Sequence, residues 1–211
     1  QGEEIIFGLG GVKGVGSSAV EGIIEARDKG GPFTSLLNFC ERVNLQRVNK
    51  STIEKLIFVG AFDFTGAPRK RLCAALDTFI ARAQQKQKDD AAGQSSFFNM
   101  FQSSNTQEQA SEAGDDELAP WAEVGEWNQK QALEHEKQNL GFYVSGHPLD
   151  RFADLIGELN VTPVHALPRC GRFEVVSLVG IVSAFRAMPS KQWGRFAFMT
   201  LEDRTGDIEL F

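Results

Sequence analysis

The segment from Leu9 to Ala19 most constrains the fold, because two glycines stand one residue apart directly before a helical pattern. It reads Leu-Gly-Gly-Val-Lys-Gly-Val-Gly-Ser-Ser-Ala. Gly14 and Gly16 lack a Cβ atom, so both can adopt positive φ and allow the backbone to turn tightly. Ser17 is expected to cap the helix that follows. The segment therefore predicts a tight hairpin with a helix behind it.

The predicted hairpin has the chemistry of a phosphate-binding site. The first turn of the following helix exposes free N–H groups beside the positive end of the helix dipole, which suits a phosphate oxygen. A lysine in front of the glycines adds a full positive charge. The predicted phosphate ligands are Lys13, Gly14, Val15, Gly16 and Ser17. This pattern is typical of helix-hairpin-helix motifs, which hold a nucleic-acid backbone without reading its bases.

Three other structures can also contain glycines at this spacing: a dinucleotide-binding fingerprint, a phosphate loop and a simple turn between helices. Gly14, Gly16 and Ala19 also fit Gly-x-Gly-x-x-Ala, a variant dinucleotide fingerprint that requires a strand on either side. The segment 33–43 has a helical rather than a strand-like pattern, which argues against that fingerprint. The phosphate-loop pattern of nucleoside triphosphatases is absent, because no Gly-Lys-Ser/Thr triplet occurs. A glycine turn that only joins two packed helices remains an open alternative.

Charge is distributed unevenly along the 211 residues, a length that suits one large domain or two small ones. Residues 1–88 carry 13 basic and 9 acidic side chains, a net charge of +4. Residues 89–140 carry 2 against 11, or −9, and residues 141–211 carry 7 against 8, or −1. The basic first block favours a phosphate partner, whereas the acidic block should repel DNA.

Cysteine and histidine usage predicts neither a metal site nor disulfides. The residues concerned are far apart and lack metal-ligand spacing: Cys40, Cys73, Cys170, His135, His147 and His165. Reduced thiols are typical of a cytoplasmic protein. No apolar run approaches the length of a membrane span, and the N-terminus lacks the pattern of a signal peptide, so no membrane association is expected.

Four helices are predicted in the first block: 17–29, about 35–42, one capped by Asn49 and ended by Gly60, and one from Pro68 to about Lys88. The last two resemble a degenerate second hairpin in which Val59-Gly60-Ala61 replaces Gly-Val-Gly. Because the second glycine is missing there, we expect the second hairpin mainly to pack against the rest of the domain. Its candidate electrostatic contacts to DNA are Arg69, Lys70 and Arg71. An ordinary solvated helix start explains these three cations equally well.

A polar segment from Asp89 to about Pro120 is predicted to be a flexible linker, because Ser, Gln, Asn, Gly, Asp and Glu dominate it. It contains an apolar cluster, Gln94-Ser95-Ser96-Phe97-Phe98, followed by Met100 and Phe101. Exposed aromatic side chains are costly unless they dock against another surface. The cluster therefore indicates a docking peptide, with a chance occurrence as the alternative.

The last third of the chain changes from helical to β patterning. Helices are predicted at 127–140 and about 149–159, and strands at 175–186, 195–201 and 207–211. This spacing suits a Greek-key barrel of the OB type, which has five strands, so the chain is expected to stop inside a domain. The predicted fold class is an α+β multidomain fragment, with a helix-hairpin-helix domain, a linker, a helical connector and a truncated OB-type β-barrel.

In the order of these parts, the chain resembles the α-subunit family of bacterial DNA polymerase III, the C-family replicative polymerases, in the region after the fingers. The segments that carry the resemblance are 6–16, 31–33, 39–43, 48–50, 56–63, 140–149, 200–203 and 205–206. The resemblance implies the end of the fingers and a tandem helix-hairpin-helix domain that binds duplex DNA at 1–88. It implies a flexible acidic linker with a clamp-binding peptide at 89–120, a helical connector at 121–170, and the first strands of an incomplete OB domain at 171–211.

The resemblance also assigns partners. The peptide of Gln94, Phe97 and Phe98 would bind the bacterial sliding clamp, the beta subunit, although Phe97 stands where the family usually has Leu or Met. The OB domain would lie near single-stranded template. Its possible contacts are Arg186, Lys191, Trp193 and Arg195, joined by Phe185 and Phe196 unless these two belong to the core. Other replisome subunits are further expected partners.

No segment matches the catalytic palm of this family, so the chain is expected to hold no catalytic residue and no cofactor. By resemblance the parent protein is a DNA-directed DNA polymerase that uses Mg²⁺. Two alternatives from other classes remain at this point. One is a DNA-repair adaptor built from helix-hairpin-helix and OB domains, and the other is an anticodon-binding fragment of an aminoacyl-tRNA synthetase.

Overall fold

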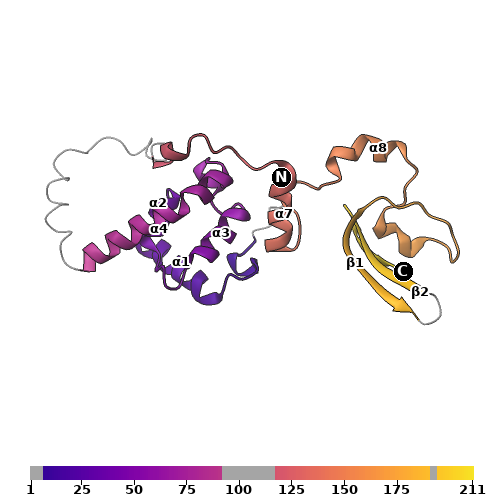
Figure 1. Cartoon of the computed structure of the whole chain (residues 1–211), viewed down its shortest axis with the longest axis horizontal. Helices are drawn as coiled ribbons and strands as arrows, with labels where there is room; N and C mark the ends of the chain where they lie inside the picture. The colour runs from indigo at the N-terminus through magenta and orange to yellow at the C-terminus, as the bar shows by residue number, and fades with distance from the viewer. Residues whose placement is uncertain (1–6, 92–116, 191–193) are drawn as a thin grey trace. The chain divides into compact units, whose positions relative to one another are not determined.

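The structure, a computed structural model, describes residues 7–91, 117–190 and 194–211. It divides into two compact units, Gln1–Tyr143 and Val144–Phe211 (Figure 1). The first unit is helical and the second contains a three-stranded antiparallel sheet. The α+β fold class is therefore confirmed as a helical domain followed by a partial β fold. The predicted connector at 121–170 is divided between the two units.

The helical unit contains the four predicted helices at nearly the predicted positions. Its elements are η1 (Leu9–Gly11), α1 (Ser17–Gly30), α2 (Leu36–Arg42), α3 (Lys50–Phe58), η2 (Asp63–Thr65), α4 (Arg69–Ala91), η3 (Ala119–Trp121) and α7 (Gln129–Leu140). Side-chain caps fix the starts of α2 and α3. The Ser35 hydroxyl accepts a hydrogen bond from the Asn38 N–H at 3.1 Å. The side-chain amide oxygen of Asn49 accepts one from the Thr52 N–H at 2.9 Å.

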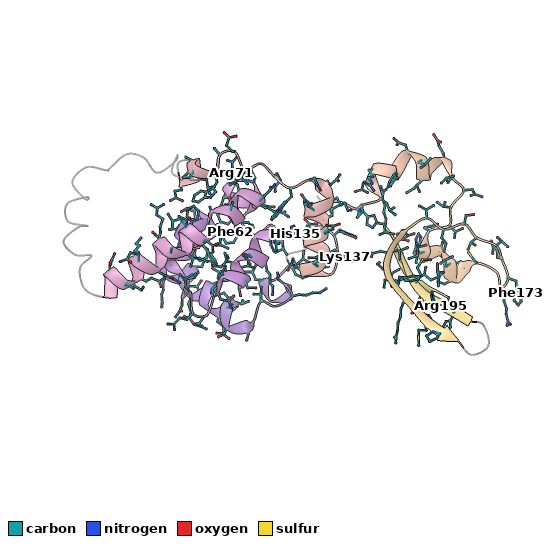
Figure 2. The ribbon with its side chains drawn as sticks, viewed as in Figure 1. Phe62, Arg71, His135, Lys137, Phe173 and Arg195 are labelled. Carbon is teal, nitrogen blue, oxygen red and sulfur yellow. The ribbon has the colours of Figure 1, made fainter. Side chains whose placement is uncertain are left out.

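The core of this unit lies where α4 packs along α2 and α3 (Figure 1). Helical spacing places one apolar stripe of α4 on that side, and its members are almost fully buried: Leu72, Ala75, Leu76, Phe79 and Ala83. The facing helices contribute Leu36, Phe39, Cys40, Ile53, Leu56 and Ile57. Figure 2 places Phe62 in the same interior, where its ring meets Phe39 edge-on at 5.0 Å between centroids.

The residues that follow the polar segment, from Leu118 onward, pack against the same helical core. Leu118 is buried, and the Trp121 ring packs edge-on against Phe79 of α4 at 5.7 Å. Two guanidinium nitrogens of Arg71 (Figure 2) donate to the carbonyl oxygens of Ala122 and Val124, at 3.0 and 3.1 Å. The residues on both sides of the polar segment therefore belong to one unit.

Helix α7 is the last part of this unit, and a capping box between Asn128 and Gln131 fixes its start. Its His135 ring (Figure 2) stacks on Phe58 of α3 at 4.3 Å and lies 4.5 Å from the Trp127 ring. Burial among these rings lowers the pKa of His135, while the nearby Glu134 carboxylate acts in the opposite direction. The imidazole ring therefore completes an aromatic contact between α3 and α7.

A buried ion pair is the second attachment of α7. Glu136 is fully buried, and its carboxylate accepts from Arg69 at the start of α4 at 3.2 Å. The same guanidinium binds the Asp63 carboxylate of η2 at 2.6 Å, and the Arg69 side chain is only 15% exposed. These contacts join η2, α4 and α7 around one cation. They also raise the pKa of Arg69, chiefly through the hydrogen bond to Asp63.

The second unit is built around an antiparallel meander. It contains η4 (Asp150–Phe152), α8 (Ala153–Glu158), η5 (Val164–Arg169), β1 (Ile181–Ser190), β2 (Gly194–Asp203) and β3 (Gly206–Leu210). The strands pair in the order β1-β2-β3, with Ile181 opposite Glu202 and Leu201 opposite Ile208. The first strand begins at Ile181 and not at Val175 as predicted. The 3₁₀ helix η5 was not predicted.

The turn between β2 and β3 is held by one carboxylate. Asp203 accepts hydrogen bonds from the N–H groups of Thr205 and Gly206, at 2.6 and 3.0 Å, and from the N–H of Val164 at 2.8 Å. An aspartate that satisfies the backbone of its own turn is a common device in tight turns. Here it also attaches η5 to the sheet, because Val164 begins that element.

Replacement of Glu136 by alanine is expected to destabilise the helical unit by about 3 kcal/mol, because Arg69 would lose a buried counterion while remaining largely out of water. Urea unfolding followed by far-ultraviolet circular dichroism measures this change. The control is Glu134→Ala on the same helix. Its exposed carboxylate pairs with Lys130 at 3.8 Å, and the expected loss is below about 0.5 kcal/mol. Equal losses in the two variants would contradict a structural role for the buried pair.

Candidate nucleic-acid interface

The hairpin before α1 uses its two glycines differently. Gly14 has φ of +80°, a conformation that favours glycine, whereas Gly16 has φ of −79° and ψ of 158° and is extended. Gly16, not Ser17, is the N-cap of α1, and no side chain caps the helix. Gly16 therefore does not adopt the positive φ that a glycine permits, and Ser17 is not the cap of α1 as the sequence had suggested. Since Ser17 is the first helical residue, its hydroxyl does not occupy the N-cap position.

The first hairpin leaves several amides without a protein acceptor. Among the described residues, no oxygen accepts a hydrogen bond from the N–H groups of Gly14, Gly16, Ser17 or Ser18. The first residues of a helix have no acceptor inside the helix, so such groups need an external one. Together with the helix dipole, these amides provide a surface that attracts an anion.

The Val15 amide is not part of this surface, although it was predicted to be a phosphate ligand. Its N–H donates to the Val12 carbonyl oxygen at 3.0 Å, and its side chain is buried. The N–H of Lys13 is also engaged, because it donates to the carbonyl oxygen of Asn139 on α7 at 2.8 Å. The Lys13 side chain remains exposed. The Lys13 backbone is thus fixed by α7, and its ammonium group lies near Gly141 at the end of that helix.

The second hairpin differs from the first in that its turn amides are already paired. Gly60 has φ of +83°, and its N–H donates to the Ile57 carbonyl oxygen at 3.0 Å. The Ala61 N–H donates to the Leu56 carbonyl oxygen at 2.9 Å. At the start of α4 the Glu126 carboxylate accepts from the N–H groups of Arg69 and Lys70, at 2.6 and 3.3 Å. An anion from the protein therefore fills the place that a phosphate would take.

The three cations predicted at this second hairpin are not equivalent. Arg69 binds Asp63 and Glu136, and Arg71 binds two backbone carbonyls, so both guanidinium groups have structural partners. Lys70 is exposed, and only its backbone N–H is engaged. These structural roles were not predicted. Asp63 lies six residues before Arg69, but Glu136 lies 67 residues after it, and the two carbonyls bound by Arg71 lie 51 and 53 residues after that arginine. Only Lys70 keeps its side chain available to a phosphate.

The residues predicted to contact single-stranded DNA divide between the two faces of the sheet. Arg186 lies opposite Phe198 and Met188 lies opposite Phe196, so these four side chains share one face. Phe185 lies opposite Met199, and by the same alternation it shares the other face with Arg195 (Figure 2). Phe185 is 67% exposed and Phe196 is 39% exposed, so neither lies in a closed core in this unit. Lys191 and Trp193 lie outside the described residues.

The predicted clamp-binding residues Gln94, Phe97 and Phe98 lie outside the residues that the structure describes. Within the described ranges, no group of three or more His, Cys, Asp or Glu side chains is arranged to hold a metal ion. Among the helices that the structure describes, none combines the length and the apolar character needed to cross a membrane.

Comparison with known proteins agrees with this geometry. A family model described as a helix-hairpin-helix motif matches residues 1–72. The chain is 35% identical to DNA polymerase III subunit alpha of Vibrio cholerae, 33% to that of Escherichia coli K12 and 36% to that of Neisseria meningitidis serogroup B. Each match covers 98% of this chain and 17% of the relative, so the chain spans about a sixth of the length of these relatives.

The fold and the matched motif define the first unit as a helix-hairpin-helix domain. Over nearly its whole length, the chain is homologous to a segment of DNA polymerase III alpha subunits, as the resemblance implied. The helix-hairpin-helix interpretation of Leu9–Ala19 is thereby preferred to the dinucleotide fingerprint.

The same substitution at the two glycines is expected to have opposite effects on stability. Gly14→Ser places an L side chain at φ +80° and is expected to lower the free energy of unfolding by about 1–2 kcal/mol. Gly16→Ser places a favoured N-cap residue in extended backbone with open space around its Cβ, and is expected to be neutral or slightly stabilising. Urea unfolding of both variants tests this difference. A loss at Gly16→Ser as large as that at Gly14→Ser would contradict the observed geometry.

Proposed function

We propose that the first hairpin binds the phosphate backbone of duplex DNA. The observation that carries the proposal is the set of four amides, at Gly14, Gly16, Ser17 and Ser18, that have no acceptor among the described residues. They follow directly on Lys13, whose side chain is exposed. Amides and ammonium groups donate to phosphate oxygens, which are the same for every base sequence. Binding is therefore expected to be independent of DNA sequence and to weaken as salt rises.

The proposed cellular context is chromosomal replication. The alpha subunits that this chain resembles are named as parts of DNA polymerase III, which favours a DNA-directed DNA polymerase as the parent over a repair adaptor or an aminoacyl-tRNA synthetase. In this proposal the chain is a non-catalytic segment that holds DNA, and Mg²⁺ is bound by the catalytic palm elsewhere in the parent. A cytoplasmic location and contacts with other replisome subunits form part of the same proposal.

The polar segment is proposed to tether the polymerase to the sliding clamp, the beta subunit, through Gln94, Phe97 and Phe98. The sequence pattern supports this role. The flanking structure adds a second argument, since α4 precedes the peptide and the buried Leu118 follows it, both within the helical unit. A bound clamp would therefore be connected at both ends of the peptide to the unit that binds DNA.

The second unit is proposed to be the beginning of an OB-type barrel near single-stranded template. The antiparallel meander with exposed aromatic side chains on both of its faces supports this proposal. Of the cations predicted there, Arg195 shares a face with Phe185, and that face is the better candidate for base stacking combined with phosphate contact. Arg186, on the opposite face, is the weaker candidate.

Lys13→Gln is expected to weaken duplex binding about fivefold near 0.1 M salt and to reduce the slope of log affinity against log salt by about 1. Fluorescence anisotropy with a labelled duplex measures both quantities. The control is Lys29→Gln, an exposed lysine in the last turn of α1, about 20 Å from the hairpin along that helix. Duplex binding by the unaltered chain that does not respond to salt would contradict the proposal.

Replacement of Gln94, Phe97 and Phe98 by alanine is expected to abolish binding to a bacterial sliding clamp, which for a short peptide should be roughly micromolar. Isothermal titration calorimetry compares the unaltered chain with the triple variant. Duplex binding serves as the control, because it should be unchanged. Absence of clamp binding by the unaltered chain would overturn the tether proposal and leave the DNA proposal intact.

A further inference from the structure

Lys55 on α3 reaches the glycine turn of the first hairpin. A Cβ atom at Gly14 would collide with the Nζ atom of Lys55. The ammonium group of Lys55 therefore lies directly against the Gly14 backbone. The missing side chain at Gly14 has two effects, because it permits the positive φ and leaves the space that this ammonium group occupies.

Several other cations of the helical unit pair with carboxylates. Arg47 pairs with Glu21 and Glu25 of α1 at 3.1 and 2.9 Å. Lys50, five residues before Lys55 on the same helix, pairs with Asp77 at 2.6 Å. Within the described part of the chain, Lys55 and Lys13 have no carboxylate oxygen within 4 Å. The Lys55 ammonium group thus lies against a turn where, among the described residues, the Gly14 and Gly16 amides have no acceptor, and Lys13 immediately precedes that turn in the sequence.

An ammonium group without a carboxylate partner, beside amides without an acceptor, attracts an anion. We infer that Lys55 is a phosphate-binding residue of the first hairpin, supplied by the second half of the domain. This inference rests on the proposed duplex binding and adds a residue that sequence reasoning did not select. It also gives the second hairpin a function. The amides of the second turn, at Gly60 and Ala61, are already paired, but α3 delivers the Lys55 ammonium group to the first turn.

The partner class that this arrangement recognises is a nucleic-acid phosphate group. The ammonium group of a lysine is a compact charge that binds phosphate from many directions, and it does not need the planar geometry that an arginine fork demands. Lys13 precedes the turn, while Lys55 approaches it from a different helix. A phosphate at the turn would then contact two charges fixed by independent parts of the fold.

Lys55→Gln in the full 211-residue chain tests the inference. We expect duplex affinity near 0.1 M salt to fall about fivefold, with the salt slope reduced by about 1, and Lys55→Arg to retain most of the binding. Lys29→Gln is the charge-matched control and should leave both quantities unchanged. Thermal unfolding of each variant separates a loss of contact from a loss of fold.

The outcomes distinguish the two proposals. If Lys13→Gln weakens binding and a folded Lys55→Gln variant does not, the role of Lys55 is overturned while the hairpin proposal stands. If the unaltered chain does not bind duplex DNA, both are overturned. If Lys55→Gln weakens binding no more than Lys29→Gln does, the effect is one of net charge and the specific role of Lys55 is again overturned.

Discussion

The packing of the helical unit depends on the ion pairs that the guanidinium group of Arg69 forms. This group lies between the carboxylates of Asp63 and Glu136, and the second of these is fully buried. A buried carboxylate is tolerated only with a partner, and Arg69 supplies one where α7 packs near the start of α4. That position brings the Asn139 carbonyl oxygen to the N–H of Lys13. A single buried ion pair thus couples the second hairpin, through α7, to the backbone of the first.

The two hairpins show how similar local patterns acquire different roles. Both turns contain a glycine at positive φ, at Gly14 and at Gly60. In the second turn, protein carbonyls accept from the amides, and Glu126 occupies the start of α4. In the first, the amides of Gly16 and Ser17 are unpaired among the described residues, and lysines replace the carboxylates. One hairpin is satisfied within the fold, and the other is left to bind an external anion. This difference in hydrogen bonding is the physical basis of the proposed function.

Local signals predicted the helices well, because their causes are local. Asn49 caps α3 and Gly141 ends α7, and both features can be read from a few neighbouring residues. Long-range partners were beyond such reasoning: neither the Arg69–Glu136 pair, 67 residues apart, nor the reach of Lys55 to Gly14 has a sequence signature. The extended Gly16 was missed for another reason, since a glycine permits positive φ without requiring it. The β1 start was placed too early because the apolar run from Val175 continues before the first paired residue, Ile181.

The central claim is that backbone amides of the first hairpin bind a DNA phosphate. The most direct measurement is a two-dimensional ¹⁵N–¹H spectrum of the chain during titration with a short duplex. The account predicts that the amide signals of Gly14, Gly16, Ser17 and Ser18 shift as duplex is added. The signals of Gly60 and Ala61, whose N–H groups are already paired, should stay in place. Shifts confined to the second hairpin, or an unchanged first hairpin in a chain that binds duplex DNA, would contradict the claim.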